Sequence, residues 1–226
     1  RVVATRAPEK VTRADRARSL HGIYVILNDD PQMLELAQAV LDAGVRIVQY
    51  RAKRGIVAKH VLALRNLTRR NDALLIVNDD WRATETFDCD GVHLGPGDDG
   101  FTRVAPVRAA MRDRLIGLSC GTIDEAHAAD TGDVDYVGTG SIYATTSKSD
   151  AGAPIGTAGL RAIAAATKLP VAAVGGITAR TISDVRRSGA AMAAVISAIS
   201  GSAHPRQAAA ELLDAWNRCD GAGTGS

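Results

Sequence analysis

The feature of this sequence that most restricts its fold is a regular alternation between short apolar runs and stretches with helical spacing. The runs are nearly continuous and rich in β-branched residues, as expected of parallel strands that are buried on both faces. Eight runs follow one another: GIYVIL (22–27), VRIVQYR (45–51), ALLIVN (73–78), DGVHL (90–94), LIGLS (115–119), DYVGTG (135–140), PVAAVGG (170–176) and AMAAVISAI (191–199).

Each apolar run precedes a stretch in which apolar residues recur at helical spacing. The predicted helices span 31–44, 56–70, 81–87, 102–112, 123–130, 157–167, 178–188 and 205–218. In the first of them, Pro31 suits the opening turn and Gly44 suits the C-terminal cap. Eight strand–helix pairs in about 200 residues predict a closed (β/α)8 TIM barrel, with an open doubly wound sheet as the alternative.

No linker or shift in composition divides the chain, so we expect a single-domain α/β protein. The barrel domain is predicted over residues 21–219. An N-terminal arm with a short entry helix precedes it over 1–20, and a disordered tail follows over 220–226.

Composition and charge argue against nucleic acids and membranes as partners. Aromatic residues make up 4% of the 226 residues, which is few for a single-stranded nucleic-acid platform, and the net charge of +2 comes without a basic block. The sequence has no run of about 18 apolar residues, so no membrane span is predicted. The three cysteines lie far apart without a CxxC pair, a pattern typical of a reducing compartment. We expect a cytoplasmic protein with small-molecule substrates, and the sequence leaves a homo-oligomeric state open.

Polar residues gather where the predicted strands end, and barrels of this kind build their active sites at that end. Gln49, Arg51 and Lys53 alternate after the second run, so they share one face of an extended stretch. Arginine can bind phosphate oxygens bidentately, and lysine adds a point charge. The pattern predicts an anion-binding groove; a solvated strand end that pairs with nearby acids is the alternative.

Two aspartates follow neighbouring strands. Asp79 comes after the third run and Asp98 after the fourth. Two carboxylates at adjacent strand ends, completed by waters and a substrate phosphate, describe a Mg²⁺ site. The alternative is that these acids cap helices, and it is strongest for Asp80 and Asp99.

A second polar set follows the sixth, seventh and eighth runs. The loop ATTSK (144–148) carries three hydroxyls and one ammonium, which solubility alone can also explain. The glycines of AVGGIT permit close approach of backbone N–H groups to a phosphate, and Ser197 adds a hydroxyl. His93 is expected to be a core histidine with satisfied hydrogen bonds, and it is left out of the predicted catalytic set.

Seven motifs in this order resemble the thiamine phosphate synthase family, and the resemblance covers roughly residues 22–200. The motifs are VQYRAK, VNDDW, DGVHLGPGD, IGLSC, YVGTGSIYATTSK, AVGGIT and AVISAI. The resemblance implies a transferase of thiamine biosynthesis. It joins 4-amino-2-methyl-5-(diphosphomethyl)pyrimidine to a hydroxyethylthiazole phosphate and releases pyrophosphate.

The resemblance also implies a role for each matching residue. The pyrimidine diphosphate is held by Gln49, Tyr50, Arg51, Ala52, Lys53, Asn78, Ser119 and Lys148, of which Arg51, Lys53, Ser119 and Lys148 are the expected catalytic groups. The thiazole phosphate is held by Thr145, Thr146, Ser147, Gly176, Ile196 and Ser197. Mg²⁺ is the implied cofactor, bound by Asp79 and Asp98.

In such a reaction pyrophosphate leaves first and the thiazole nitrogen captures a pyrimidine carbocation, so cations must neutralise the leaving group. Loop 144–156 is expected to close as a lid. Gly97 and Asp80 depart from the family pattern, so Asp99 or Asp80 can replace Asp98 as a metal ligand. Three other activities stay open: a thiazole-phosphate isomerase, a sugar-phosphate epimerase-like barrel and a non-catalytic phosphate binder.

Overall fold

Eight parallel strands close into one barrel, as the alternating sequence pattern predicts. The computed structural model describes residues 11–147 and 152–219. The strands pair in chain order and β1 also pairs with β8, which closes the sheet. Their bounds are β1 Gly22–Asn28, β2 Ile47–Arg51, β3 Leu74–Asn78, β4 Gly91–Leu94, β5 Leu115–Ser119, β6 Tyr136–Thr139, β7 Val171–Val174 and β8 Met192–Val195.

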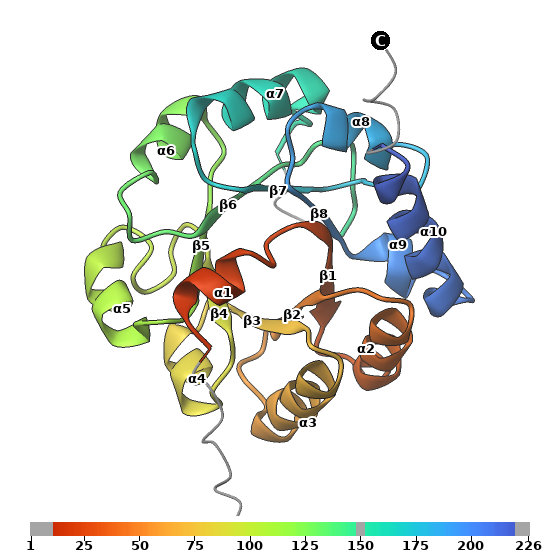
Figure 1. Cartoon of the computed structure of the whole chain (residues 1–226), viewed down its shortest axis with the longest axis horizontal. Coiled ribbons are helices and arrows are strands. Elements are labelled where there is room, and N and C mark those ends of the chain that lie inside the picture. Colours follow the sequence, from red (N-terminus) through yellow and green to blue (C-terminus); the bar gives the residue numbers. More distant parts are fainter. Residues whose placement is uncertain (1–10, 148–151, 220–226) are drawn as a thin grey trace, which may run out of the picture.

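Helices form a ring around this barrel (Figure 1). Their bounds are α1 Arg13–Ala17, α2 Met33–Asp42, α3 Ala58–Arg70, α4 Trp81–Thr86, α5 Val104–Met111, α6 Ile123–Ala128, α7 Gly156–Ala166, α8 Ile182–Arg187, α9 Ser197–Ser200 and α10 Pro205–Asn217. The predicted (β/α)8 TIM barrel is therefore confirmed. The predicted arm (1–20) lies partly and the tail (220–226) wholly outside the described residues. None of the described helices is both long and apolar enough to cross a membrane.

Three boundaries differ from the sequence-based prediction. Pro31 precedes α2, because Asp30 holds a turn: its carboxylate accepts the N–H of Gln32 at 3.0 Å and its carbonyl accepts that of Met33. The helix predicted over 178–188 spans only α8, after a turn. The last apolar run is not a strand throughout: β8 ends at Val195, where its pairing with β1 stops, and the remaining residues form α9.

Two cores follow from the strand alternation. Side chains that point into the barrel form the smaller core, which includes Tyr24, Ile47, Ile76 and Tyr136. Side chains that point outward pack under the helices and form the larger core. Gln49 lies two positions after Ile47, so it points into the barrel, as expected from the period of a strand.

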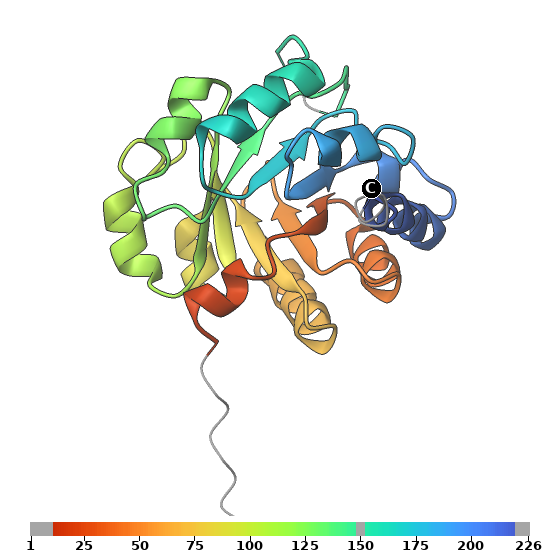
Figure 2. The ribbon, with the colours of Figure 1, turned by 45° about the horizontal axis from the view of Figure 1, so that its top comes forward.

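The N-terminal end of the barrel is covered by α1 (Figure 1, Figure 2). Arg13 Nε donates to Asp135 at 2.6 Å, and Arg16 Nε donates to Asp90 at 3.2 Å. Each aspartate directly precedes a strand, is almost fully buried, and also accepts a backbone N–H of the preceding strand. Each aspartate also pairs with a second arginine: Arg65 pairs with Asp90 and Arg108 pairs with Asp135.

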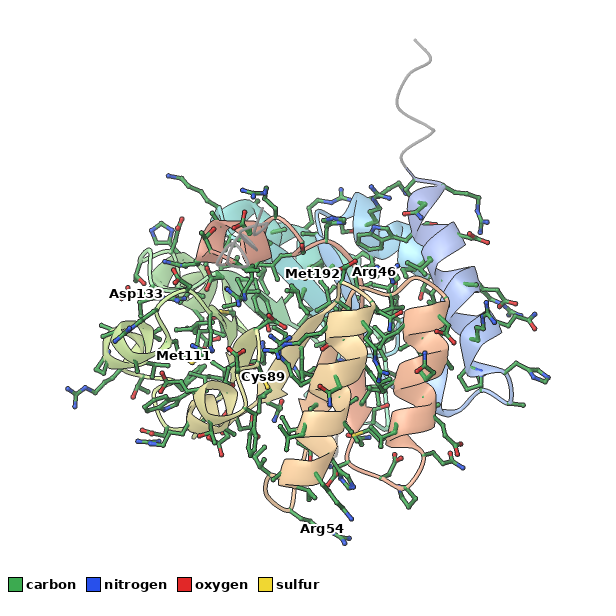
Figure 3. The ribbon with its side chains drawn as sticks, turned by 60° about the horizontal axis from the view of Figure 1, so that its bottom comes forward. Arg46, Arg54, Cys89, Met111, Asp133 and Met192 are labelled. Carbon is green, nitrogen blue, oxygen red and sulfur yellow. The ribbon has the colours of Figure 1, made fainter. Side chains whose placement is uncertain are left out.

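The C-terminal ends of the strands lie at the opposite end of the barrel. Figure 3 shows the direction of the strands. Arg54, which follows β2, lies at one end of the barrel. Arg46, which precedes β2, and Met192, which begins β8, lie at the other end. The loops after the strands therefore face away from α1, which is the end where barrel enzymes bind substrates.

Candidate active site

A cavity of about 370 Å³ opens at the C-terminal ends of the strands. Its wall is built by residues from every strand or from the loop that follows it. Ile26, Ala172, Val174 and Ala194 supply apolar surface, and the predicted site residues lining it are Gln49, Asn78, Ser119, Thr145, Ser147, Gly176, Ile196 and Ser197. Apolar walls with a few convergent polar groups are the usual composition of a small-molecule site.

A chain of hydrogen bonds crosses the floor of this cavity. Gln49 Nε2 donates to the Tyr24 hydroxyl at 2.7 Å, and that hydroxyl lies 3.0 Å from the hydroxyl of Tyr136. His93 Nδ1 lies 3.2 Å from the Tyr136 hydroxyl, and His93 Nε2 lies 3.1 Å from Ser119 Oγ. Five strands thus contribute one side chain each, and the chain links two predicted substrate-binding residues, Gln49 and Ser119.

Burial keeps the phenols of this chain neutral. Desolvation raises the pKa of Tyr24 and that of Tyr136, because the phenolate form would lose its water. A neutral phenol both donates and accepts a hydrogen bond. The hydrogen-bonded row of side chains can therefore orient Gln49 and Ser119 without adding charge to the cavity.

The Ser119–His93 pair is a feature that the sequence analysis did not predict. His93 has partners at both ring nitrogens, as expected of a satisfied histidine, but one of them is the hydroxyl of a site residue. In a Ser-His-Asp triad the second nitrogen faces a carboxylate, whereas here it faces Tyr136. Cys120 also lines the cavity, and burial raises the pKa of its thiol to about 11, so it is no ready nucleophile.

Glycines on β5 and β6 make room for the rings of the chain. A Cβ at Gly117 would lie 2.1 Å from Tyr136 Cζ, and a Cβ at Gly138 would lie 2.7 Å from His93 Cε1. Both contacts are shorter than carbon atoms allow. The sequence motifs LIGLS and YVGTG therefore owe their glycines to the rings beside them.

We expect Gly117→Ala to lower the free energy of unfolding by about 1–3 kcal/mol, because the added methyl group must displace a buried ring. Urea denaturation monitored by circular dichroism measures it. Gly121→Ala is the matched control, since its Cβ would meet only Glu125 Oε2 at an ordinary 3.5 Å. Equal losses in the two variants would contradict the steric explanation.

The residues predicted to hold the diphosphate do not all face the cavity. Asn78 lines it at the end of β3. Arg51 is the half-exposed last residue of β2 and is not among the residues that line the cavity. Tyr50 points outward into the larger core, where its hydroxyl accepts the N–H of Val57 at 3.2 Å. Ala52 also packs against that core, so both offer only backbone groups to a ligand. The extended stretch ends at Arg51, and Lys53 lies exposed in the turn that follows, not on the strand face predicted for it.

The four candidate acids separate into two kinds. Asp80 caps α4, accepting the N–H of Ala83 at 2.9 Å, as its alternative reading predicted. Asp99 does not cap a helix; its carboxylate accepts from Trp81 Nε1 at 3.2 Å and from Arg82. Both carboxylates are thus engaged with α4.

Asp79 and Asp98 lie in the loops that follow β3 and β4. Asp79 has a backbone φ of 69°, a left-handed conformation that aspartate and asparagine tolerate better than most residues. Asp98 Oδ2 accepts the N–H of Gly95 at 2.6 Å. Within residues 11–147 and 152–219, no three His, Cys, Asp or Glu side chains are grouped to hold a metal ion. Mg²⁺ needs only one or two protein carboxylates, because this ion keeps several waters and takes phosphate oxygens as ligands.

The loop after β6 reaches the cavity through two of its hydroxyl residues. Thr145 and Ser147 line the cavity, and Thr145 Oγ1 accepts the N–H of Ser147 at 3.2 Å. Thr146 is exposed. Lys148 lies outside the described residues, as does part of the predicted lid, 144–156.

The glycine pair after β7 admits that loop. Gly175 and Gly176 have φ values of 100° and 65°. A Cβ at Gly175 would lie 2.2 Å from Ser141 Oγ, and one at Gly176 would lie 2.6 Å from the Ala144 carbonyl oxygen. The loop after β6 therefore lies directly against the glycine pair, and the phosphate contact predicted for Gly176 stays a prediction.

A short helix completes this side of the cavity. Ile196 precedes α9 as its N-cap residue and Ser197 is its first residue; both line the cavity. The first N–H groups of a helix have no partner within it, so they can face an anion. Sequence reasoning took this segment as strand, since it reads as a continuous apolar run.

Sequence reasoning did not assign Tyr24, His93 or Tyr136 to the site. Tyr24 and His93 line the cavity, and the Tyr136 hydroxyl lies within hydrogen-bond distance of both. The signal available was their strand position: Tyr24 and Ile26, like Tyr136 and Gly138, alternate on one face. That pattern places the rings inside the barrel, but it does not show that they bond one another, because they come from strands far apart in sequence.

Comparison with known proteins identifies the family. The sequence matches the family described as thiamine monophosphate synthase over residues 23–199. A thiamine-phosphate synthase from Moorella thermoacetica is 40% identical over 194 residues, covering 83% of this chain and 90% of that protein. One from Chloroflexus aurantiacus is 40% identical over 178 residues, covering 77% of this chain and 81% of the relative.

Longer relatives and solved structures agree with this match. A bifunctional thiamine biosynthesis protein from Symbiobacterium thermophilum is 40% identical over 88% of this chain, which spans 42% of that protein. The structure of thiamine phosphate pyrophosphorylase from Pyrococcus furiosus has a TM-score of 0.78 and 32% identity, covering 89% of this chain and 98% of that one. Because the family match extends from β1 to α9 and the relatives align over most of the barrel, the chain belongs to the thiamine monophosphate synthase family of transferases.

Proposed function

We propose that this protein couples 4-amino-2-methyl-5-(diphosphomethyl)pyrimidine with 4-methyl-5-(2-phosphooxyethyl)thiazole to give thiamine phosphate and pyrophosphate. One observation carries the proposal: two sets of anion-binding groups flank a single cavity. Gln49 and Asn78 line the cavity from β2 and β3, and Arg51 ends β2. Thr145 and Ser147 line it from the loop after β6, across the closed barrel, and Ser197 lines it after β8. Two phosphorylated substrates that must meet suit this arrangement.

Loss of pyrophosphate before the new bond forms needs no protein nucleophile. It needs positive charge at the leaving group, which Arg51, Lys53 and Lys148 supply in this proposal. Ser119 and Asn78 offer neutral hydrogen bonds nearby. A reaction without a protein nucleophile agrees with the cavity, because the thiol of Cys120 has a raised pKa and the Ser119–His93 pair lacks the carboxylate of a triad.

The apolar walls of the cavity have a second task. A pyrimidine cation would react with any water that reached it before the thiazole nitrogen did. Ile26, Ala172 and Ala194 line the cavity and are buried, so they exclude water from its floor. The hydrogen-bonded chain beneath them keeps Gln49 and Ser119 in place without adding a nucleophile.

Asp79 and Asp98 are the proposed Mg²⁺ ligands. The Asp80 carboxylate caps α4 and the Asp99 carboxylate pairs with Arg82, so this proposal assigns these two acids no metal role. When bound, the ion neutralises charge on the diphosphate oxygens. The cytoplasmic location and a homo-oligomeric assembly remain predictions.

Pyrophosphate release from the purified protein tests this function. We expect release only when both substrates and Mg²⁺ are present, with thiamine phosphate formed in equal amount. Lys148→Ala should reduce both products together. Absence of release, with thiazole phosphate still bound, would move the protein to the isomerase or non-catalytic class.

A further inference from the structure

The end of β1 holds the end of β2 at two points. Asn28 lies opposite Arg51 in the parallel register of these strands. Arg51 Nη1 donates to Asn28 Oδ1 at 3.2 Å, and the next residue, Asp29, donates its backbone N–H to the Arg51 carbonyl at 2.9 Å. Both the main chain and the guanidinium of Arg51 are therefore held by two consecutive residues.

The partner of this guanidinium is neutral, which is unusual for the partly buried arginines of this protein. At the other end of the barrel, Arg13, Arg65 and Arg108 each pair with a buried carboxylate. Among the described residues Arg51 forms no ion pair. An amide oxygen takes one of the five guanidinium hydrogens and leaves the positive charge uncompensated. The geometry thus orients the group and keeps it available to an anion.

The loop that follows Arg51 is held by the same corner of the barrel. Asp29 Oδ1 lies 2.6 Å from Nδ1 of His60 on α3. The Tyr50 hydroxyl accepts the N–H of Val57, just before α3 begins. These bonds fix both ends of the segment that carries Lys53. Figure 3 shows the neighbouring Arg54 at this same end of the molecule.

We propose that Asn28 is a positioning residue for the diphosphate site: it aims the guanidinium of Arg51 without neutralising it. The inference rests on the proposed function, in which Arg51 binds the diphosphate. A carboxylate at this position would orient Arg51 equally well but would compete with the substrate for its charge. A contact that only joined two strand ends could be made equally well by a carboxylate. The neutral amide of Asn28 is specifically suited to a positioning role, because it leaves the charge of Arg51 available to the diphosphate.

Binding of inorganic pyrophosphate in the presence of Mg²⁺ tests this inference by calorimetry. We expect Asn28→Ala to weaken binding about 10-fold, since a hydrogen bond to a charged group is lost. Asn28→Asp should also weaken binding, although it keeps the acceptor oxygen and strengthens the bond to Arg51. If Asn28 were only a structural acceptor, Asn28→Asp would restore full binding.

A double-mutant cycle shows whether the effect passes through Arg51. In an Arg51→Ala background, Asn28→Ala should change binding by less than about twofold, because the group it orients is gone. Asn71→Ala is the matched control: Asn71 also makes one side-chain hydrogen bond, to the Leu67 carbonyl on α3, far from the cavity. It should leave pyrophosphate binding unchanged.

The outcomes separate this inference from the proposed function. Unchanged binding in Asn28→Ala, or an equal loss in the Arg51→Ala background, would overturn the positioning role. Binding that is insensitive to Arg51→Ala would overturn it too, because Arg51 would not contact the anion. Wild-type protein that binds pyrophosphate through Arg51 but forms no thiamine phosphate would overturn the proposed function alone.

Discussion

Asp79→Asn should nearly abolish Mg²⁺-dependent pyrophosphate release while leaving the barrel as stable as before. An amide keeps the size of the side chain but lacks the negative charge that holds a divalent cation. Loss of several kcal/mol of charge stabilisation corresponds to roughly 10²–10³-fold in rate. Asparagine also tolerates the left-handed backbone at this position, so the substitution adds no strain. Steady-state release of pyrophosphate measures the rate.

Asp72→Asn is the control for this experiment. Asp72 also has a positive φ, 49°, but it lies before β3, at the opposite end of the barrel from the cavity. Its replacement should leave both rate and stability unchanged. Full activity in Asp79→Asn would exclude Asp79 as a ligand of the required metal.

Asp135→Ala should be the most destabilising single substitution at the N-terminal end of the barrel. The side chain is 4% exposed and accepts from Arg13 at 2.6 Å, from Arg108 at 2.6 Å and from the N–H of Ile116 at 2.7 Å. Its removal leaves a largely buried guanidinium and a backbone N–H without their acceptor, a change that typically costs about 3–5 kcal/mol. Urea unfolding measures the loss.

An exposed ion pair supplies the comparison. Asp184 pairs with Arg187 on the surface of α8, where both side chains are more than half exposed. Asp184→Ala should cost no more than about 1 kcal/mol, because solvent screens such pairs. A similar loss in both variants would show that the Asp135 ion pairs add nothing beyond a surface contact.

The fold could be read from the sequence because its signals are local. Eight apolar runs, each followed by a helical period, are visible without knowing any long-range contact. Gly44, predicted at the C-terminal cap, directly follows the cap residue Ala43 of α2 and has a positive φ. The error at β8 has a physical cause. Apolar residues continue into α9, but only the pairing with β1 decides where the strand stops.

The candidate site could be predicted only where it depends on strand ends. Gln49, Asn78 and Ser119 line the cavity because the C-terminal ends of parallel strands converge there. Lys53 was predicted to share a strand face with Gln49 and Arg51 but lies in a turn, because the extended stretch ends at Arg51. Asn28 carries no motif, and its role depends on the β1–β2 register.

The sequence by itself determined the barrel, the family and the end of the barrel at which the polar residues collect, because strand period, helix period and motif order are properties of the chain alone. The tertiary structure decided which of those residues meet. Tyr24, Tyr136 and His93 become one hydrogen-bonded chain, and Gly175 admits the loop after β6, only when strands distant in sequence close the sheet. Hydrogen bonds and steric contacts act over a few ångströms, so they exist only after folding brings these groups together.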